Sequence, residues 1–140
     1  MVALINTHRL KQAIKKEDVA KLKSVIQQVW DHQLSHEFRH PVNWRELGLE
    51  DYPQIIKKPM DLSTVKRNLS KSAYKTYEDF FNDIQLIWDN CKTYNMAESE
   101  IYKYAEELEK KYKSVKAKTI QSLGLQPQKE GNSTPKKKKA

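Results

Sequence analysis

Apolar residues recur at steps of three and four along four stretches of the chain, a spacing that puts them on one face of an α-helix. The first stretch predicts a helix over about residues 18–34, and three more helices are expected after Asp61, Thr76 and Ser99. The apolar positions are Val19, Leu22, Val25, Ile26, Val29, Trp30 and Leu34; Leu62, Val65 and Leu69; Tyr77, Phe80, Phe81, Ile84, Ile87, Trp88 and Cys91; and Ile101, Tyr104, Ala105, Leu108, Tyr112 and Val115. No stretch competes with the alternating pattern of a strand. The sequence therefore predicts an all-α protein, a four-helix bundle.

The residues just before these helices are of types that cap helix N-termini. Their side chains accept hydrogen bonds from the unpaired N–H groups of the first turn. The expected caps are Asp18, Asp61, Thr76 and Ser99, and Asp79 would complete a capping box with Thr76.

The connection between the first two helices is unusually long. It covers residues 36–61, whereas helices in bundles are commonly joined by ~2–8 residues. Its three prolines oppose helix continuation, yet it is rich in large apolar side chains: Phe38, Val42, Trp44, Leu47, Leu49, Tyr52, Ile55, Ile56 and Met60. A long loop of this composition is expected to pack against the bundle and to shape a site. Together with residues 95–98 it would enclose a cavity at one end.

The formal charge of +8 is concentrated at the two ends of the chain. Residues 1–23 carry +4 and residues 116–140 carry +6, which leaves −2 for residues 24–115. The predicted division is a basic N-terminal arm or helix extension over 1–17, a domain over 18–117 and a basic flexible tail over 118–140. The tail ends in Lys136 to Lys139, a cluster that is either a solvated segment, a nuclear import signal or a phosphate contact. If the protein contacts nucleic acid, the Lys-rich arms, and not the slightly acidic domain, are expected to make that contact, without sequence preference.

Several classes of protein are disfavoured by the composition. With three glycines in the chain, no phosphate-binding glycine loop is present, and no nucleophile elbow or zinc-protease helix motif occurs, so an enzyme is not expected. Cys91 is the single cysteine, and the four histidines form no cluster with it or with carboxylates, so no metal or cofactor is expected. The chain has no apolar run long enough for a membrane span and no signal-peptide pattern, which predicts an intracellular protein.

Three short motifs occur in order along the chain. They are Asp51-Tyr52-Pro53-Gln54-Ile55-Ile56-Lys57-Lys58-Pro59-Met60-Asp61-Leu62, Tyr74-Lys75-Thr76-Tyr77-Glu78-Asp79-Phe80 and Asn90-Cys91-Lys92-Thr93-Tyr94-Asn95. They resemble the end of the long first loop, and the start and end of the third helix, of the bromodomain family, helical bundles of chromatin proteins that read acetyl-lysine. The resemblance covers about residues 20–115 and implies a four-helix bundle of bromodomain type with a long packed loop.

The resemblance also implies a role for each matching residue. Asn95 matches the asparagine whose amide donates to the acetyl carbonyl, and Tyr52 matches the tyrosine that reaches the same oxygen through an ordered water. The other pocket residues would be Phe38, Val42, Leu47, Leu49, Tyr94 and Ile101. Where many relatives have a Trp-Pro pair two residues before the phenylalanine, this chain has His36 and Glu37, so the apolar shelf is incomplete unless Trp44 supplies part of it.

Such a pocket suits acetyl-lysine physically. Acetylation converts an ammonium into a neutral amide, which an apolar pocket accepts while it excludes the unpaired charge of unmodified lysine. An asparagine amide donates to the carbonyl without adding a counter-charge that would favour the ammonium.

The resulting interpretation is a non-catalytic, nuclear reader of acetylated histone tails that works within a chromatin-associated complex. Two alternatives stay open. One is a helical DNA- or nucleosome-binding module that uses the basic arms, and the other is a scaffold of the same fold with weak or lost acetyl-lysine binding. Asn95 could also simply end its helix in the left-handed conformation, as asparagines at helix ends often do.

Overall fold

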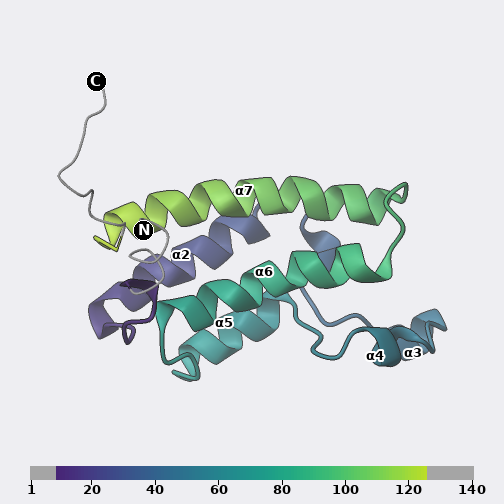
Figure 1. Cartoon of the computed structure of the whole chain (residues 1–140), viewed down its shortest axis with the longest axis horizontal. Coiled ribbons are helices and arrows are strands. Elements are labelled where there is room, and N and C mark those ends of the chain that lie inside the picture. Colours follow the sequence, from purple (N-terminus) through teal and green to yellow (C-terminus); the bar gives the residue numbers. More distant parts are fainter. Residues whose placement is uncertain (1–8, 126–140) are drawn as a thin grey trace.

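The computed structural model describes residues 9–125, and four long helices dominate them (Figure 1). These are α2 (Val19–Trp30), α5 (Leu62–Ser70), α6 (Tyr77–Tyr94) and α7 (Glu100–Ser122). Helices α2 and α6 each pack against both α5 and α7, which makes a four-helix bundle with α2 and α6 on opposite sides. Within the described residues no strand forms, and the predicted all-α fold is confirmed.

The predicted apolar faces form the core. The side chains predicted for the third helix are all buried, and Trp88, Tyr77 and Tyr112 are the largest that are fully enclosed. The face of the fourth helix is buried from Ala105 onward, while Ile101 and Tyr104 are half-buried at its edge. Burial of these faces against one another is the main term that stabilises the bundle.

Three of the four predicted N-caps form as expected. The side chains of Asp61, Thr76 and Ser99 each accept a hydrogen bond from a backbone N–H in the first turn, and Thr76 and Asp79 form a capping box. Asp18 precedes α2 but makes no capping bond, because its backbone is helical and its carboxylate accepts from the Tyr77 hydroxyl instead. The prediction for Asp18 was therefore wrong in its bonding partner.

The first helix is shorter than predicted. It ends at Trp30, and residues 31–35 form turns, although Leu34 still packs on the core. The carbonyl oxygen of Trp30 accepts from Ser35 Oγ and, at 2.9 Å, from Arg39 Nη2, so two side chains from the following loop replace the next helical turn.

The segment before α2 does not extend that helix. Ala13 pairs with Thr76 in an isolated antiparallel bridge, and a 3₁₀ turn, η1 (Lys16–Asp18), leads into α2. Ile14 donates from its backbone to Lys75 O, which holds this segment against the start of α6 and lets its apolar side chains pack on the core. The helix extension is therefore wrong for residues 11–15, and residues 1–8 lie outside the described part.

The C-terminal end of α7 continues into the predicted tail. The helix runs to Ser122, Thr119 and Leu125 are buried, and Arg9 Nη1 donates to Gly124 O. The described chain therefore starts and finishes at one end of the bundle, on the left in Figure 1. The remainder of the predicted tail, residues 126–140, lies outside the described residues.

The long connection is not a bare loop. It carries a 3₁₀ turn, η2 (His36–Phe38), and two one-turn helices, α3 (Trp44–Leu47) and α4 (Tyr52–Ile55). Gly48 ends α3 with a φ of +73°, a conformation that glycine adopts without strain, and Pro53 lies in the first turn of α4, where its missing N–H costs nothing. Phe38, Tyr52 and Ile56 are buried, so the loop packs as predicted.

Candidate binding site

A cavity of about 180 Å³ lies at the end of the bundle that carries α3, α4 and the connection between α6 and α7. All eight residues predicted for the pocket line it: Phe38, Val42, Leu47, Leu49, Tyr52, Tyr94, Asn95 and Ile101. Its volume is below the ~300–1,000 Å³ of sites for drug-sized molecules, and it matches a single extended side chain better.

One face of α6 supplies the inner wall. Ile87, Asn90, Cys91 and Tyr94 follow one another at helical spacing, and Asn95 completes the row as the residue that ends the helix. Because Cys91 and Asn95 are four residues apart, their side chains lie one above the other on this wall.

Asn95 presents its amide to the cavity from a fixed position. Its backbone is extended, with φ −102° and ψ 156°, so it does not take the left-handed conformation of a simple helix-ending asparagine. Nδ2 lies 2.9 Å from Cys91 O and 3.5 Å from Cys91 Sγ. The bond to Cys91 O uses one N–H within the protein, and the long contact to Sγ, a weak acceptor, leaves the second N–H able to donate to a ligand oxygen.

Tyr52 from the long connection and Tyr94 from α6 line the cavity together. Their rings meet edge to face at 4.9 Å, and the Tyr94 hydroxyl donates to Asp51 Oδ1 at 2.7 Å, which clasps α4 to the end of α6. That hydrogen bond raises the pKa of Tyr94. Burial, with a smaller effect of the neighbouring Cys91, raises the pKa of Tyr52, so its hydroxyl stays a donor at neutral pH.

Arg39 anchors the first part of the loop through three hydrogen bonds. Its guanidinium donates to Trp30 O and to Ser35 Oγ, and its carbonyl accepts from Ser63 N at 2.9 Å. The loop is thereby tied both to the end of α2 and to the start of α5, which fixes Phe38 in the wall.

The last part of the loop is tied to α6. Asn90 Nδ2 donates to Lys58 O at 2.8 Å, and Lys58 Nζ lies 3.0 Å from Asp83 Oδ1. The buried Asp83 also accepts from the Tyr74 hydroxyl at 2.7 Å, a bond that is one of several causes of a raised pKa at Tyr74, burial being the largest. These contacts fix the end of the loop against α6 and so hold the cavity wall in position.

The three candidate shelf residues do not all lie at the cavity. Glu37 lines the cavity, whereas His36 and Trp44 do not. The indole of Trp44 instead lies under the Arg45 guanidinium, at 4.7 Å, in a shallow pocket on the outer side of the loop. The structure therefore does not place Trp44 where the missing Trp-Pro pair would be.

Five lining residues were absent from the predicted pocket: His40, Met60, Ile87, Asn90 and Cys91. The three from α6 could have been found by spacing, because Cys91 and Ile87 stand four and eight residues before Asn95, and Asn90 stands four residues before Tyr94. Met60 belongs to the Pro59-Met60-Asp61 motif. His40 had no signal in the sequence, since its position depends on the Arg39 anchor.

Cys91 is a small buried wall residue. Its thiol lies 3.4 Å from Ile101 O, which links the end of α6 to the start of α7. Burial raises its pKa to about 11, so the thiol is protonated at neutral pH. Within residues 9–125 no group of histidine, cysteine and carboxylate side chains could hold a metal ion.

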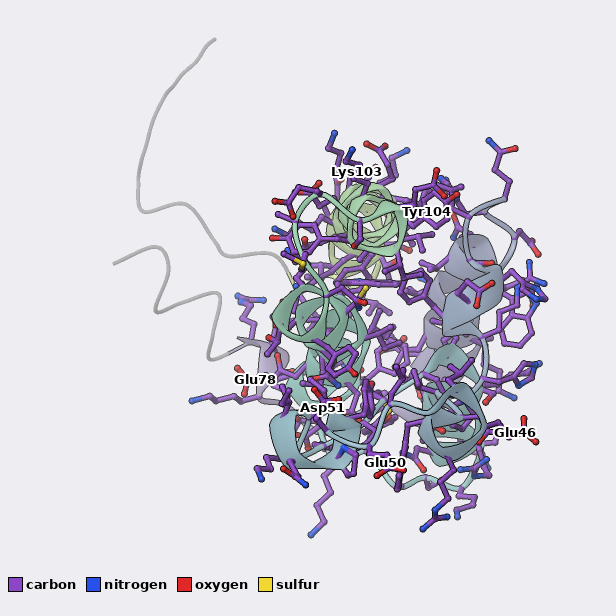
Figure 2. All side chains as sticks on the ribbon, turned by 90° about the vertical axis from the view of Figure 1, so that its right-hand side faces the viewer. Glu46, Glu50, Asp51, Glu78, Lys103 and Tyr104 are labelled. Atoms are coloured by element: carbon purple, nitrogen blue, oxygen red, sulfur yellow. The ribbon has the colours of Figure 1, made fainter. Side chains whose placement is uncertain are left out.

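The end of the bundle that carries the cavity has three carboxylates, labelled in Figure 2, on its loop side. Glu46, Glu50 and Asp51 lie on the loop side, while Lys103 and Tyr104 lie on α7 at the opposite side (Figure 2). Leu47 and Met96 are 64% and 73% exposed, so apolar contact surface is also available at the entrance. Such a mouth favours a basic peptide chain.

Comparison with known proteins assigns a family to this arrangement. The family model described as Bromodomain matches residues 22–107, more than half of the chain. Three Arabidopsis thaliana proteins are similar: "Transcription factor GTE7", 42% identical over 84 residues, "Transcription factor GTE5, chloroplastic", 41% over 83, and "Transcription factor GTE1", 34% over 89. These matches cover 60%, 59% and 64% of the chain but 14%, 17% and 23% of the relatives' own lengths.

Proposed function

The chain belongs to the bromodomain family, and from that membership we propose that it is a non-catalytic reader which binds acetylated lysine, as found in histone tails, in the cavity at the end of the bundle. Asn95 would donate its free amide N–H to the acetyl carbonyl. Tyr52 would reach the same oxygen through a water molecule. Phe38, Val42 and Ile101 would surround the methyl group and the lysine stem.

The observation that carries this proposal is the Asn95 amide, half-buried in a mainly apolar cavity with one N–H already bonded to Cys91 O. A buried donor favours a ligand acceptor that satisfies it, and a neutral amide carbonyl does so without bringing a charge into the apolar walls. Unmodified lysine would have to bury its ammonium among mainly apolar walls, where the one possible counter-ion in the described lining is the exposed Glu37.

A role in transcription and a nuclear location are part of the same proposal. The similar Arabidopsis proteins are named transcription factors, although one of the names also carries the word chloroplastic. Because the chain matches less than a quarter of their length, the complex in which it would act is a proposal as well. None of the helices in residues 9–125 is long and apolar enough to cross a membrane.

The test is a titration of the protein against acetylated and unmodified histone peptides. We expect binding only to acetylated peptides, with a micromolar or weaker Kd. Asn95→Ala should weaken it by about 5- to 150-fold, which corresponds to the ~1–3 kcal/mol lost when a buried polar group is left unpaired. Asn82→Ala is the matched control, because Asn82 is exposed on α6 and does not line the cavity.

Circular dichroism and thermal unfolding must show that all three proteins fold. If folded wild type fails to bind any acetylated peptide, or if Asn95→Ala binds as wild type does, the proposal is wrong. Failure of the wild type to bind would favour the alternative of a scaffold of the same fold that has lost acetyl-lysine binding. Glu37, which lines the cavity where many relatives have part of a Trp-Pro pair, would then be the first residue to substitute.

A further inference from the structure

The outward side of α2 is flanked by two grooves, one shared with α5 and one shared with α7. The first is lined by Lys23, Ser24, Gln27, Trp30 and Lys66 among others, and the second by Lys21, Gln28 and Lys118 with Ser24 again at its edge. We call this surface the α2 face. It lies on the side of the bundle away from α6 and does not include the cavity.

The charges on the α2 face are of one sign. Helices α2 and α5 contain four bases, Lys21, Lys23, Lys66 and Arg67, and no acid. No carboxylate lines either groove, and none of the four ion pairs found in residues 9–125 involves a lysine of this face.

Three acids flank α2, Glu17 and Asp18 before it and Asp31 after it, but none of them lines either groove. Asp18 at its start accepts from the Tyr77 hydroxyl, and Asp31 at its end accepts from Gln27 Nε2 at 2.8 Å. Although residues 24–115 carry a net charge of −2, many of their positive and negative side chains lie on different parts of the surface. The loop at the cavity end carries Glu46, Glu50 and Asp51, whereas the lysines of the α2 face make no ion pair within residues 9–125.

We propose that the α2 face binds the phosphate backbone of duplex DNA. Lysines supply the electrostatic attraction, and the serine and glutamine side chains between them supply hydrogen-bond donors to phosphate oxygens, the combination that positions proteins on a duplex without reading its sequence. The proposal extends DNA contact from the basic arms to the folded domain and does not depend on acetyl-lysine binding.

The aromatic content of the α2 face favours duplex DNA over single-stranded DNA as the partner. Proteins that bind single strands stack bases on open aromatic rings. Trp30, the one aromatic residue lining these grooves, already carries Arg39 Cζ at 5.3 Å and Lys66 Nζ at 5.8 Å from its ring centre. It is therefore occupied by cations and offers no stacking platform, which favours a partner recognised through its backbone.

The end of the described chain adds to this face. Ser122, which lines the second groove, accepts from Lys21 Nζ at 3.2 Å, and Leu125 follows it three residues later. Residues 126–140 carry five lysines and one glutamate. They continue the chain from Leu125, three residues after Ser122.

The experiment measures binding of the full chain to a fluorescent 20-base-pair duplex by anisotropy, between 50 and 200 mM salt. The test variant is Lys23→Glu with Lys66→Glu. The charge-matched control is Lys57→Glu with Lys103→Glu, whose residues are exposed but line neither groove. A third variant replaces Lys136 to Lys139 with alanine.

We expect the test variant to bind duplex at least about ten-fold more weakly at 100 mM salt. Its log–log salt slope should fall by about two, because each substituted lysine leaves about one phosphate without its neutralising charge. The control should change affinity by less than about three-fold. Thermal unfolding of each variant separates weaker binding from a failure to fold.

Four results would overturn the proposal. They are no binding of duplex by wild type, equal weakening in test and control variants, weakening in the tail variant alone, and tighter binding of a single-stranded 20-mer or of anionic lipid vesicles than of duplex.

Discussion

At the scale of single residues, the chemistry of the cavity depends on one asparagine and the cysteine one turn before it. Asn95 gives one N–H to Cys91 O, and this bond holds the amide in place before any ligand arrives. Cys91 in turn contacts Ile101 O across the gap between α6 and α7. The donor of the site is therefore oriented by the end of the helix itself, and a ligand does not have to order it.

The thiol of Cys91 should react slowly. Because burial raises its pKa from 9.0 to about 11, the thiolate fraction at pH 8 is about 100-fold lower than in the unfolded chain, and the thiolate is the reactive form. We expect iodoacetamide to label the folded protein about 100-fold more slowly than the chain in denaturant, as followed by mass spectrometry. The chain has one cysteine, so the signal is unambiguous. Equal rates would mean that the cavity wall opens readily.

At the scale of elements, α6 and α7 are joined by a polar cluster midway along the bundle. Glu109 Oε1 lies 2.6 Å from Lys92 Nζ, and its Oε2 accepts from Gln85 Nε2 at 2.6 Å and lies 3.6 Å from Lys113 Nζ. Burial alone would raise the pKa of Glu109, but the hydrogen bonds from Lys92 and Gln85 outweigh it and hold the pKa below 4.5.

This cluster predicts a specific pH dependence of stability. A carboxyl whose pKa is lowered by folding stabilises the protein above its unfolded pKa, here 4.5, and loses that contribution as the pH falls through its lower folded pKa. Glu109→Gln should lower the free energy of unfolding by about 1–3 kcal/mol at pH 7 and by less at pH 3. Urea unfolding at both pH values measures the difference. Glu106→Gln, at an exposed position on the same helix, is the control. Equal losses at both pH values would contradict the assignment.

At the scale of the whole molecule, the helices were more predictable than the parts between them. The apolar faces around Trp88 and Leu108 follow from spacing alone, and the caps Thr76 and Ser99 follow from residue type. The end of α2 at Trp30 did not, because it depends on Arg39, a residue that reaches back from the loop.

The residues of the site likewise fall into those that sequence spacing predicts and those that it does not. Spacing placed Cys91 beside Asn95, but the roles of Asn95 and Tyr52 came from resemblance to a family, and no local pattern announces them. Lining by His40 and Glu37, and the outward position of Trp44, result from how the loop is anchored in space. Tertiary contacts of this kind leave no periodic signal in the sequence.

The core also extends beyond the region that the family model matches. Residues 22–107 omit Tyr112, which is fully buried and donates to Phe81 O at 2.8 Å, as well as the buried Val115 and Leu125. Because loss of a single large core side chain costs about 3–5 kcal/mol, a fragment of residues 22–107 should unfold at much lower urea than a fragment of residues 9–125. Circular dichroism during urea titration compares them. Matching midpoints would show that this half of α7 adds little.

The position of the two described chain ends has a consequence for longer proteins built around this domain. Arg9 and Gly124 meet at the end of the bundle opposite the cavity. The described chain therefore begins and ends away from the cavity, so an acetylated peptide would approach the face of the bundle opposite to both attachment points. Attachment to a larger protein at these two points leaves the cavity end of the bundle as the part farthest from the attachment.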